Sequence, residues 1–358
     1  DNLEMLIKGT PDWHNIVNDN FIRVRDTINN LDLGEASATV VVATSKSRNK
    51  DKADFIVPVD SINAQETIMD AIRRLPYGVG GKVILLEGTY TVNEGIFCSD
   101  DNVTIEGVGG STVIKADNSF NTSSGLARGD MFTNGNNTNR NLIFRDLIID
   151  CNELANGFSY FQTSDSLIEN VLILNPRHSG IELGACSNFK IIGNTIFNNK
   201  VIDNTGIRIG IQPNRNLLID SNTISNLEEG IKLSSVSEII ISNNLIINNS
   251  NYGINMSYKA FDNMIINNML VRNGYAQVGY AGHIYISDAS AEYNMIQGNI
   301  FRQGGNTSGD GATNGVAIKS GCKGNMIINN DMHNWGWGSA IMDSGTDTVT
   351  TSGNRGIE

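Results

Sequence analysis

The sequence predicts an all-β protein, a right-handed parallel β-helix of roughly ten rungs that runs from about residue 83 to the end of the chain. Two repeated blocks predict it. The first block is flanked by Asn and alternates apolar residues, as in "LIENVLILN" (167–175), "IIISNNLIINN" (239–249) and "MIINNMLVRN" (264–273). The second follows each of them and reads "GIEL", "GIRI", "GIKL" or "GINM". Alternation with a period of two is typical of strands.

The repeat recurs once every 22 to 31 residues when the blocks are aligned on a single Asn position. The connections lack the two-residue turns of hairpins, so each strand is expected to pair in parallel with its equivalent one coil later. Asn side chains stacked in this way can bond along the column, as amide ladders do. The predicted column contains Asp146, Asn170, Asn194, Asn222, Asn244, Asn268, Asn299, Asn330 and Asn354.

Composition excludes several classes of function. The formal net charge of −12 argues against binding to duplex nucleic acid, which requires clustered Lys and Arg. No run approaches the ~20 apolar residues of a membrane span, so no membrane insertion is expected. Neither a metal site nor another cofactor is predicted. The cysteines are too scattered for a metal or disulfide framework and are predicted to be buried in the rungs: Cys98, Cys151, Cys186 and Cys322.

The N-terminal region is predicted to be separate, with residues 1–52 forming a helical attachment segment and residues 53–358 the β-helix. Apolar residues from Val17 to Leu31 step by 4, 3, 4 and 3, which predicts a short oligomerisation helix at about 11–32. The alternative is a single helix lying on its own β-helix. A second helix at about 63–75, with Asn63 and Glu66 as a capping box, is expected to cover the first rung. At the other end, the chain is expected to continue past Glu358 or to be covered by trimer contacts.

The second block places one outward residue per rung in a single column, which contains Glu182, Arg208, Lys232, Asn255 and Tyr285. Strands stack ~4.8 Å apart, so this column spans ~19 Å. Corner residues nearby are His178, Asp203, Glu228 and Glu229. The column combines an acid with two bases, and this combination predicts a site for an anionic sugar polymer. The alternative is a solvated ladder of ion pairs.

The predicted site assigns catalysis to Glu182 and Asp203 with Arg208. The residues predicted to bind substrate are Lys232, Asn255, Tyr285, His178 and Tyr160, the tyrosines by stacking on sugar rings. Long insertions at about 117–138, 273–281 and 304–314 are expected to form walls beside this column.

The segments "ADFIVPVDSINAQETIMDAIRRLP" and "GGKVILLEGTYTV", followed by the coils, resemble the pectate-lyase-like superfamily. In particular they are similar to tail-spike and preneck appendage proteins of short-tailed Bacillus phages. The resemblance implies a homotrimer in the virion tail that contacts other virion proteins and acts outside the host cell.

The resemblance also implies that the protein binds and hydrolyses a cell-surface polysaccharide or wall teichoic acid, with acidic residues at outward positions or between subunits. These map to Glu182 and Asp203, beside Arg208. The sequence departs from the superfamily in two ways, because it lacks the calcium-binding Asp cluster of pectate lyases and the paired-Asp motif of polygalacturonases. The alternatives are a non-catalytic receptor-binding adhesin and a bacterial polysaccharide lyase or epimerase.

Overall fold

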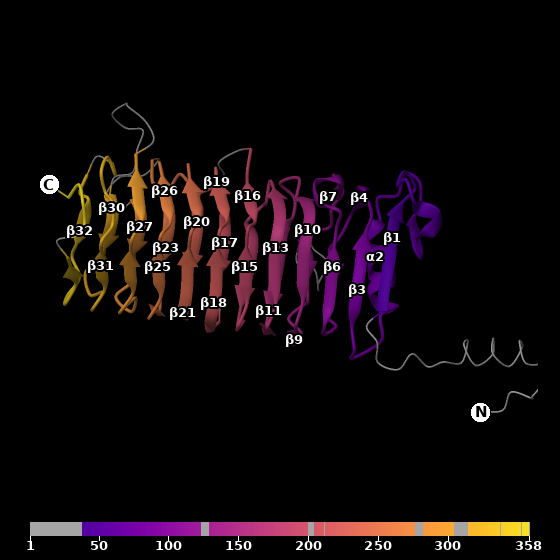
Figure 1. Cartoon of the computed structure of the whole chain (residues 1–358), viewed down its shortest axis with the longest axis horizontal. Helices are drawn as coiled ribbons and strands as arrows, with labels where there is room; N and C mark the ends of the chain where they lie inside the picture. The colour runs from indigo at the N-terminus through magenta and orange to yellow at the C-terminus, as the bar shows by residue number, and fades with distance from the viewer. Residues whose placement is uncertain are drawn as a thin grey trace, which may run out of the picture. The chain divides into compact units, whose positions relative to one another are not determined.

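The computed structural model describes residues 38–122, 129–199, 204–210, 212–275, 282–303, 314–336, 338–351 and 353–357. The predicted oligomerisation helix at 11–32 lies outside them. The described part is a parallel β-helix in which each strand pairs with its equivalent in the next coil, as Figure 1 shows by the order of the strand labels. The all-β prediction is confirmed.

Two long sheets form the walls of the coils. Sheet B contains ten strands in the described residues: β5 (Ile96–Phe97), β8 (Asp130–Thr133), β11 (Asn156–Phe161), β14 (Ser179–Gly184), β17 (Thr205–Ile209), β20 (Glu229–Leu233), β23 (Tyr252–Met256), β27 (Gly282–Ile286), β30 (Asn314–Ile318) and β32 (Ile341–Asp343). Two short strands, β9 (Asn139–Arg140) and β12 (Thr163–Ser164), pair separately.

Sheet A bends around the remaining sides and begins with β1 (Ala38–Thr44), β2 (Phe55–Val57), β3 (Gly81–Leu85), β4 (Gly88–Val92), β6 (Val103–Glu106), β7 (Thr112–Ala116), β10 (Ile143–Asp150) and β13 (Leu167–Leu174). It continues with β15 (Lys190–Ile192), β16 (Thr195–Phe197), β18 (Asn214–Asp220), β19 (Thr223–Ser225), β21 (Val236–Ser242), β22 (Leu245–Ile247), β24 (Ala260–Phe261), β25 (Met264–Ile266) and β26 (Met269–Val271). It ends with β28 (Met295–Gln297), β29 (Ile300–Arg302), β31 (Met326–Ile328) and β33 (Val349–Thr350).

The compact unit begins at Ala38, before the predicted boundary at residue 53. Strand β1 is the first described strand of the chain. It belongs to sheet A, because it pairs in parallel with both β2 and β3. The stretch "ATVVVAT" buries Val40 and Val42 in the common core. The alternation of buried residues in this stretch therefore places it in the solenoid.

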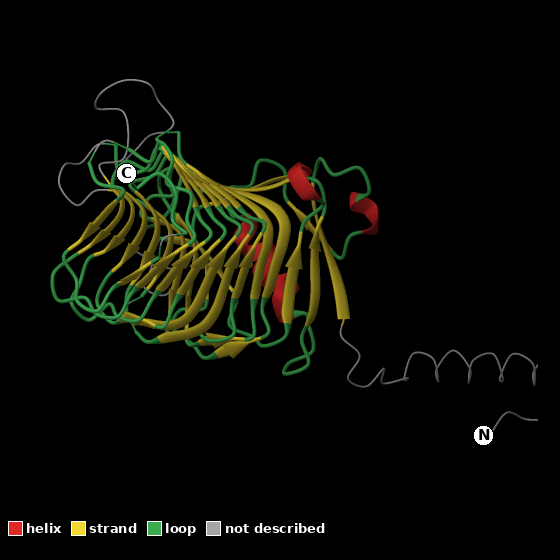
Figure 2. Cartoon of the chain, turned by 60° about the vertical axis from the view of Figure 1, so that its left-hand side comes forward, coloured by secondary structure: helices red, strands yellow, loops and turns green. Residues whose placement is uncertain are grey.

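Helix α2 (Ala64–Arg73) lies where the sequence predicts a capping helix and packs against β1, β2, β4 and β5 (Figure 2). It buries Ile68, Ala71 and Ile72 in the core. The predicted capping box is wrong, because the Asn63 side chain makes no hydrogen bond to the helix. Two short 3-10 turns, η1 (Lys50–Lys52) and η2 (Gly109–Ser111), complete the helical elements of the described residues.

A buried ladder of Asn side chains runs along one bend of sheet A. Each Nδ2 donates to the Oδ1 of the next Asn at 2.9 to 3.1 Å. Each Oδ1 also accepts the backbone N–H of the preceding Asn. These bonds satisfy polar groups that would be costly to bury unpaired. The ladder contains Asn194, Asn222, Asn244, Asn268, Asn299, Asn330 and Asn354.

The predicted Asn column is wrong at its first two members. The buried position of that coil is Val171, whose backbone N–H donates to Asn194 Oδ1. Asn170 and Asp146 lie one residue earlier, at corners with φ of 51° and 57°. The corner and the adjacent buried position both favour Asn, because Asn tolerates left-handed φ and its amide can bond along the column. The alignment of the sequence on one Asn position therefore mixed two neighbouring positions of the structure, the corner and the buried position of the ladder.

All four cysteines are free and buried, as the sequence predicts. Burial raises the pKa of the Cys98 thiol to about 12, with the Asp100 charge adding to the shift. The thiols therefore behave as apolar core groups.

Candidate functional site

The outward column predicted from the sequence matches the register of sheet B. Glu182 pairs with Arg208, Arg208 with Lys232, Lys232 with Asn255, and Asn255 with Tyr285. The flanking residues of each strand, such as Ile207 and Ile209, are fully buried and fix which side chains face outward. Neighbouring strands lie ~4.8 Å apart, so adjacent polar groups in this column can contact one ligand.

The surroundings of Arg208 contain two polar groups that lack partners. The Arg208 Nη2 donates to Thr205 Oγ1 at 3.5 Å, whereas its Nε is buried and has no hydrogen-bond partner among the described residues. One coil earlier, the position that pairs with Thr205 is Ser179, whose buried Oγ also lacks a partner there. Buried polar groups are normally satisfied, so these two groups in adjacent strands leave hydrogen-bonding capacity that the described residues do not use.

His178 is exposed at the start of β14. Its backbone N–H donates to Asn156 Oδ1 at 3.0 Å, which fixes the corner. Partial burial lowers the pKa of His178, and the charges of Arg177 and Arg208 lower it further. The imidazole therefore stays neutral near neutral pH and can accept or donate a hydrogen bond there.

Glu229 is a buried carboxylate that the sequence placed at a corner. It is the first residue of β20 and is 5% exposed. Its Oε2 lies 3.0 Å from Lys232 Nζ, and its Oε1 accepts a hydrogen bond from Asn255 Nδ2 at 2.9 Å. Asn255 Oδ1 in turn accepts from Ser287 Oγ at 2.9 Å. Asn255 is therefore held by protein groups at both ends of its amide, and it positions Glu229.

An aromatic pair extends the column. The rings of Tyr252 and Tyr285 stack with centroids 5.0 Å apart and planes inclined by 23°. Burial raises the pKa of Tyr252, and the nearby charges of Glu229 and Glu228 raise it further. Tyr285 is only 8% exposed whereas Tyr252 is half-buried, so Tyr252 is the ring of the pair that a sugar beside Glu229 could contact.

The prediction that Tyr160 contacts substrate is wrong. It pairs with Leu183, an inward residue, and it is fully buried with Phe144 at a ring-centroid distance of 5.4 Å and Phe158 at 6.5 Å. In β11 the outward residue that pairs with Glu182 is Ser159. Asp203 lies outside the described residues, as do residues 276–281 and 304–313, which make up most of two of the insertions expected to form walls. The expectation is wrong for part of the third insertion, at 117–138, because residues 130–133 form strand β8 of sheet B.

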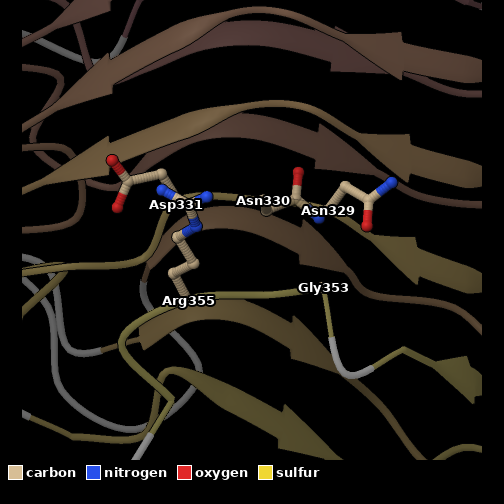
Figure 3. Close-up of a pocket in the computed structure, with 5 residues that line it drawn as sticks. All are labelled: Asn329, Asn330, Asp331, Gly353 and Arg355. Atoms are coloured by element: carbon tan, nitrogen blue, oxygen red, sulfur yellow. The ribbon is translucent and has the colours of Figure 1, made fainter.

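The described residues contain no group of three or more His, Cys, Asp or Glu side chains arranged to hold a metal ion. Over the same parts of the chain, no helix is long and apolar enough to span a membrane. A surface hollow of about 570 Å³ lies on sheet A and is lined by Asn329, Asn330, Asp331, Gly353 and Arg355 (Figure 3). It belongs to a different sheet from the polar column, and Arg302 binds Asp331 there at 2.6 Å.

A family model described as "Right handed beta helix region" matches residues 132–301. Together with the parallel register of both sheets, this decides the fold. The described part of the chain has the fold of a right-handed parallel β-helix. The resemblance identified from the sequence is confirmed at the level of this fold. A search of curated protein sequences finds no match to this β-helix.

Solved structures similar to this β-helix include an alginate lyase from Paenibacillus, with a TM-score of 0.61, 14% identity, and coverage of 86% of this chain and 99% of that one. A protein of Geobacillus virus E2, ORF18, matches with a TM-score of 0.51, 14% identity and coverage of 98% and 64%. The tailspike protein of E. coli bacteriophage HK620, solved with a pentasaccharide, matches with a TM-score of 0.55, 10% identity and coverage of 84% and 64%. This β-helix thus spans less than two thirds of either phage protein.

Proposed function

We propose that this protein is a phage tail-spike or appendage protein that binds and hydrolyses an anionic glycopolymer of the host surface, such as wall teichoic acid. The observation that carries the proposal is the polar column on sheet B, in which Glu182, Arg208 and Lys232 follow one another in register and Arg208 has a buried Nε without a partner among the described residues. A phosphate or carboxylate of the polymer would pair with the guanidinium of Arg208. The similarity in fold to two phage proteins, one solved with an oligosaccharide, supports the same function.

The residues divide into three proposed roles. Arg208 and Lys232 hold the anionic group, and Tyr252, with Tyr285 stacked on its ring, contacts a sugar ring. Glu182, in the strand adjacent to Arg208, acts as acid or base. Asp203, two residues before β17, supplies the second carboxyl that inverting or retaining hydrolysis requires.

The site is tested by incubating the full chain with purified wall teichoic acid and measuring released fragments. Glu182→Gln and Asp203→Asn are each expected to reduce fragment release at least 100-fold, because each removes a group that transfers a proton. The matched control is Glu169→Gln, which changes a half-buried Glu in the preceding strand, β13, on sheet A. Full cleavage by both site variants would refute the assignment.

A non-catalytic adhesin is the second candidate. It is favoured by the way Lys232 and Asn255 occupy both carboxylate oxygens of Glu229, which makes this part of the column a fixed ion pair. An adhesin would bind the same teichoic acid without releasing fragments, and Glu182→Gln would leave binding unchanged. A lyase would produce the ultraviolet absorbance of an unsaturated uronate from a uronate polymer, which hydrolysis does not.

We propose that the protein works as a homotrimer in the virion tail, attached to other virion proteins and acting outside the host cell. The support is the heptad spacing at 11–32 together with the resemblance to phage spikes. Sedimentation of the full chain at micromolar concentration tests this arrangement, and a monomer would contradict it.

A further inference from the structure

Within the described residues, charge in the outward column of sheet B is confined to Glu182, Arg208 and Lys232, each of which is partly exposed. The outward residues of the two coils before them and the three coils after them are uncharged and buried: Thr133, Ser159, Asn255, Tyr285 and Ala317. The accessible charge of this column is therefore limited to three neighbouring strands, which extend over ~10 Å.

The net charge of these three strands is small, because a carboxylate lies on each side of Arg208. Glu182 pairs with Arg208 from the strand before. In the strand after, Glu229 Oε2 lies 3.0 Å from Lys232 Nζ. Glu229 is 5% exposed and its other oxygen accepts from Asn255 at 2.9 Å, so the anion is fixed in place. The positive charge of Lys232 is therefore offset by an anion that cannot move away from it.

Arg208 is the cation of this column that a ligand can use most fully. In the described part of the chain, its Nη2 makes a long hydrogen bond of 3.5 Å to Thr205 Oγ1, and its buried Nε makes none. A planar guanidinium in this state can bind one phosphate through two parallel hydrogen bonds. The column therefore offers one strong position for an anion.

We propose that the site takes a single phosphate of the polymer at Arg208 and requires uncharged units on both sides of that phosphate. The inference rests on the proposed function and narrows the substrate to a glycopolymer whose phosphates are separated by sugars. A second phosphate close to the first would lie near Glu182 or Glu229, where like charges repel. Repulsion of this kind excludes a competing ligand more effectively than an added contact selects the correct one.

The strands next to Arg208 suit an uncharged sugar. The half-buried ring of Tyr252 stacks on Tyr285 with a centroid distance of 5.0 Å and can pack against the apolar face of a sugar. Burial raises the pKa of Tyr252, and the negative charges of Glu229 and Glu228 raise it further. The same negative charges that act on this ring would disfavour a phosphate beside it.

Calorimetric titration of the full chain with two teichoic acids of equal length tests the proposal. In poly(glycerol phosphate), only a glycerol separates successive phosphates. In the second polymer, a sugar within the backbone separates each glycerol phosphate from the next. The second polymer is expected to bind at least tenfold more tightly per phosphate. Sizing each polymer after the titration shows how much of it was cleaved.

The outcomes separate this inference from the proposed function. Equal affinity for the two polymers, or tighter binding of poly(glycerol phosphate), would overturn the inference and leave the proposed function standing. Binding of neither polymer would overturn both.

The variant Glu229→Gln tests the origin of the selectivity. Gln keeps an acceptor for Asn255 and removes the charge that offsets Lys232, so Lys232 becomes available to a second phosphate. Affinity for poly(glycerol phosphate) is expected to rise at least threefold more than affinity for the sugar-containing polymer. Glu169→Gln, at a half-buried position on sheet A, is the matched control and should leave the ratio of the two affinities unchanged. Circular dichroism verifies folding, and an unaltered ratio in folded Glu229→Gln would refute the proposal.

Discussion

Replacing Asn268 by Ala is expected to lower the free energy of unfolding by about 4 kcal/mol, because it interrupts the buried ladder at its centre. Asn268 Oδ1 accepts from the backbone N–H of Asn244 at 3.0 Å and from Asn244 Nδ2 at 2.9 Å. Its Nδ2 donates to Ile241 O at 2.9 Å and to Asn299 Oδ1 at 3.0 Å. All of these groups are buried, so water cannot replace the lost partners.

The magnitude follows from the groups left without partners. The substitution leaves two buried donors of Asn244 without an acceptor, its backbone N–H and one proton of its side-chain amide, each costing about 1–3 kcal/mol. Asn299 Oδ1 keeps the backbone N–H of residue 268, which donates at 2.9 Å in either variant. Two orphaned donors at about 2 kcal/mol each give the expected loss.

The measurement is chemical denaturation followed by circular dichroism, with hydrogen exchange at the Asn244 amide as a local readout. The control is Asn267→Gly, one residue earlier, where the side chain is exposed and the backbone φ is 55°. Gly adopts this φ without strain, so the control should change stability by less than about 1 kcal/mol. A loss below 1 kcal/mol for Asn268→Ala, or an equal loss in both variants, would refute the reasoning.

Three further outcomes are expected. Burial lowers the pKa of His283 to about 4, below its usual 6.5. The free energy of unfolding should therefore fall by up to about 3 kcal/mol as the pH drops from about 6.5 to 4. Chemical denaturation of His283→Gln over the same range should show a weaker dependence of this free energy on pH. Tyr160→Phe removes a buried hydroxyl without a partner in the described residues, and it should raise the unfolding free energy by about 1 kcal/mol with no change in fragment release. Arg208→Gln should weaken binding to teichoic acid at least tenfold in calorimetry, and the loss should shrink at high salt. Unchanged affinity at low salt would contradict the proposed role of Arg208.

The outward column was predictable because it depends only on the register of repeats, which the sequence shows directly. Glu182, Arg208 and Lys232 each follow a Gly-Ile pair, so one alignment placed them together. The ladder was harder to align, because corner and buried positions both favour Asn and differ by one residue, as at Asn170 and Val171. A pattern of residue types cannot separate neighbouring columns that prefer the same side chain.

The orientation of two residues at the site could be seen only in the structure. Tyr160 lies in "NGFSYF", in which all six residues are buried, so the stretch shows no polar alternation that would reveal its direction. Glu229 precedes a Gly-Ile pair and was expected at a corner, yet it is the first residue of β20 and its carboxylate contacts Lys232, three residues later. The i,i+3 spacing of Glu229 and Lys232 was visible, but in a regular strand residues three apart point to opposite faces, so the spacing did not predict the contact.

The candidate site lies on the coils where the interior side chains change from phenylalanines to isoleucines and the Asn ladder. Inside the coils before Glu182, Phe132, Phe144 and Phe158 pack against one another at centroid distances of 5.1 to 5.3 Å. From Asn194 onward the interior combines isoleucines with the Asn ladder. The outward register of sheet B continues across this change, with Glu182 still paired to Arg208. Because backbone pairing sets the register and the interior side chains pack behind it, interior packing and outward chemistry can vary separately.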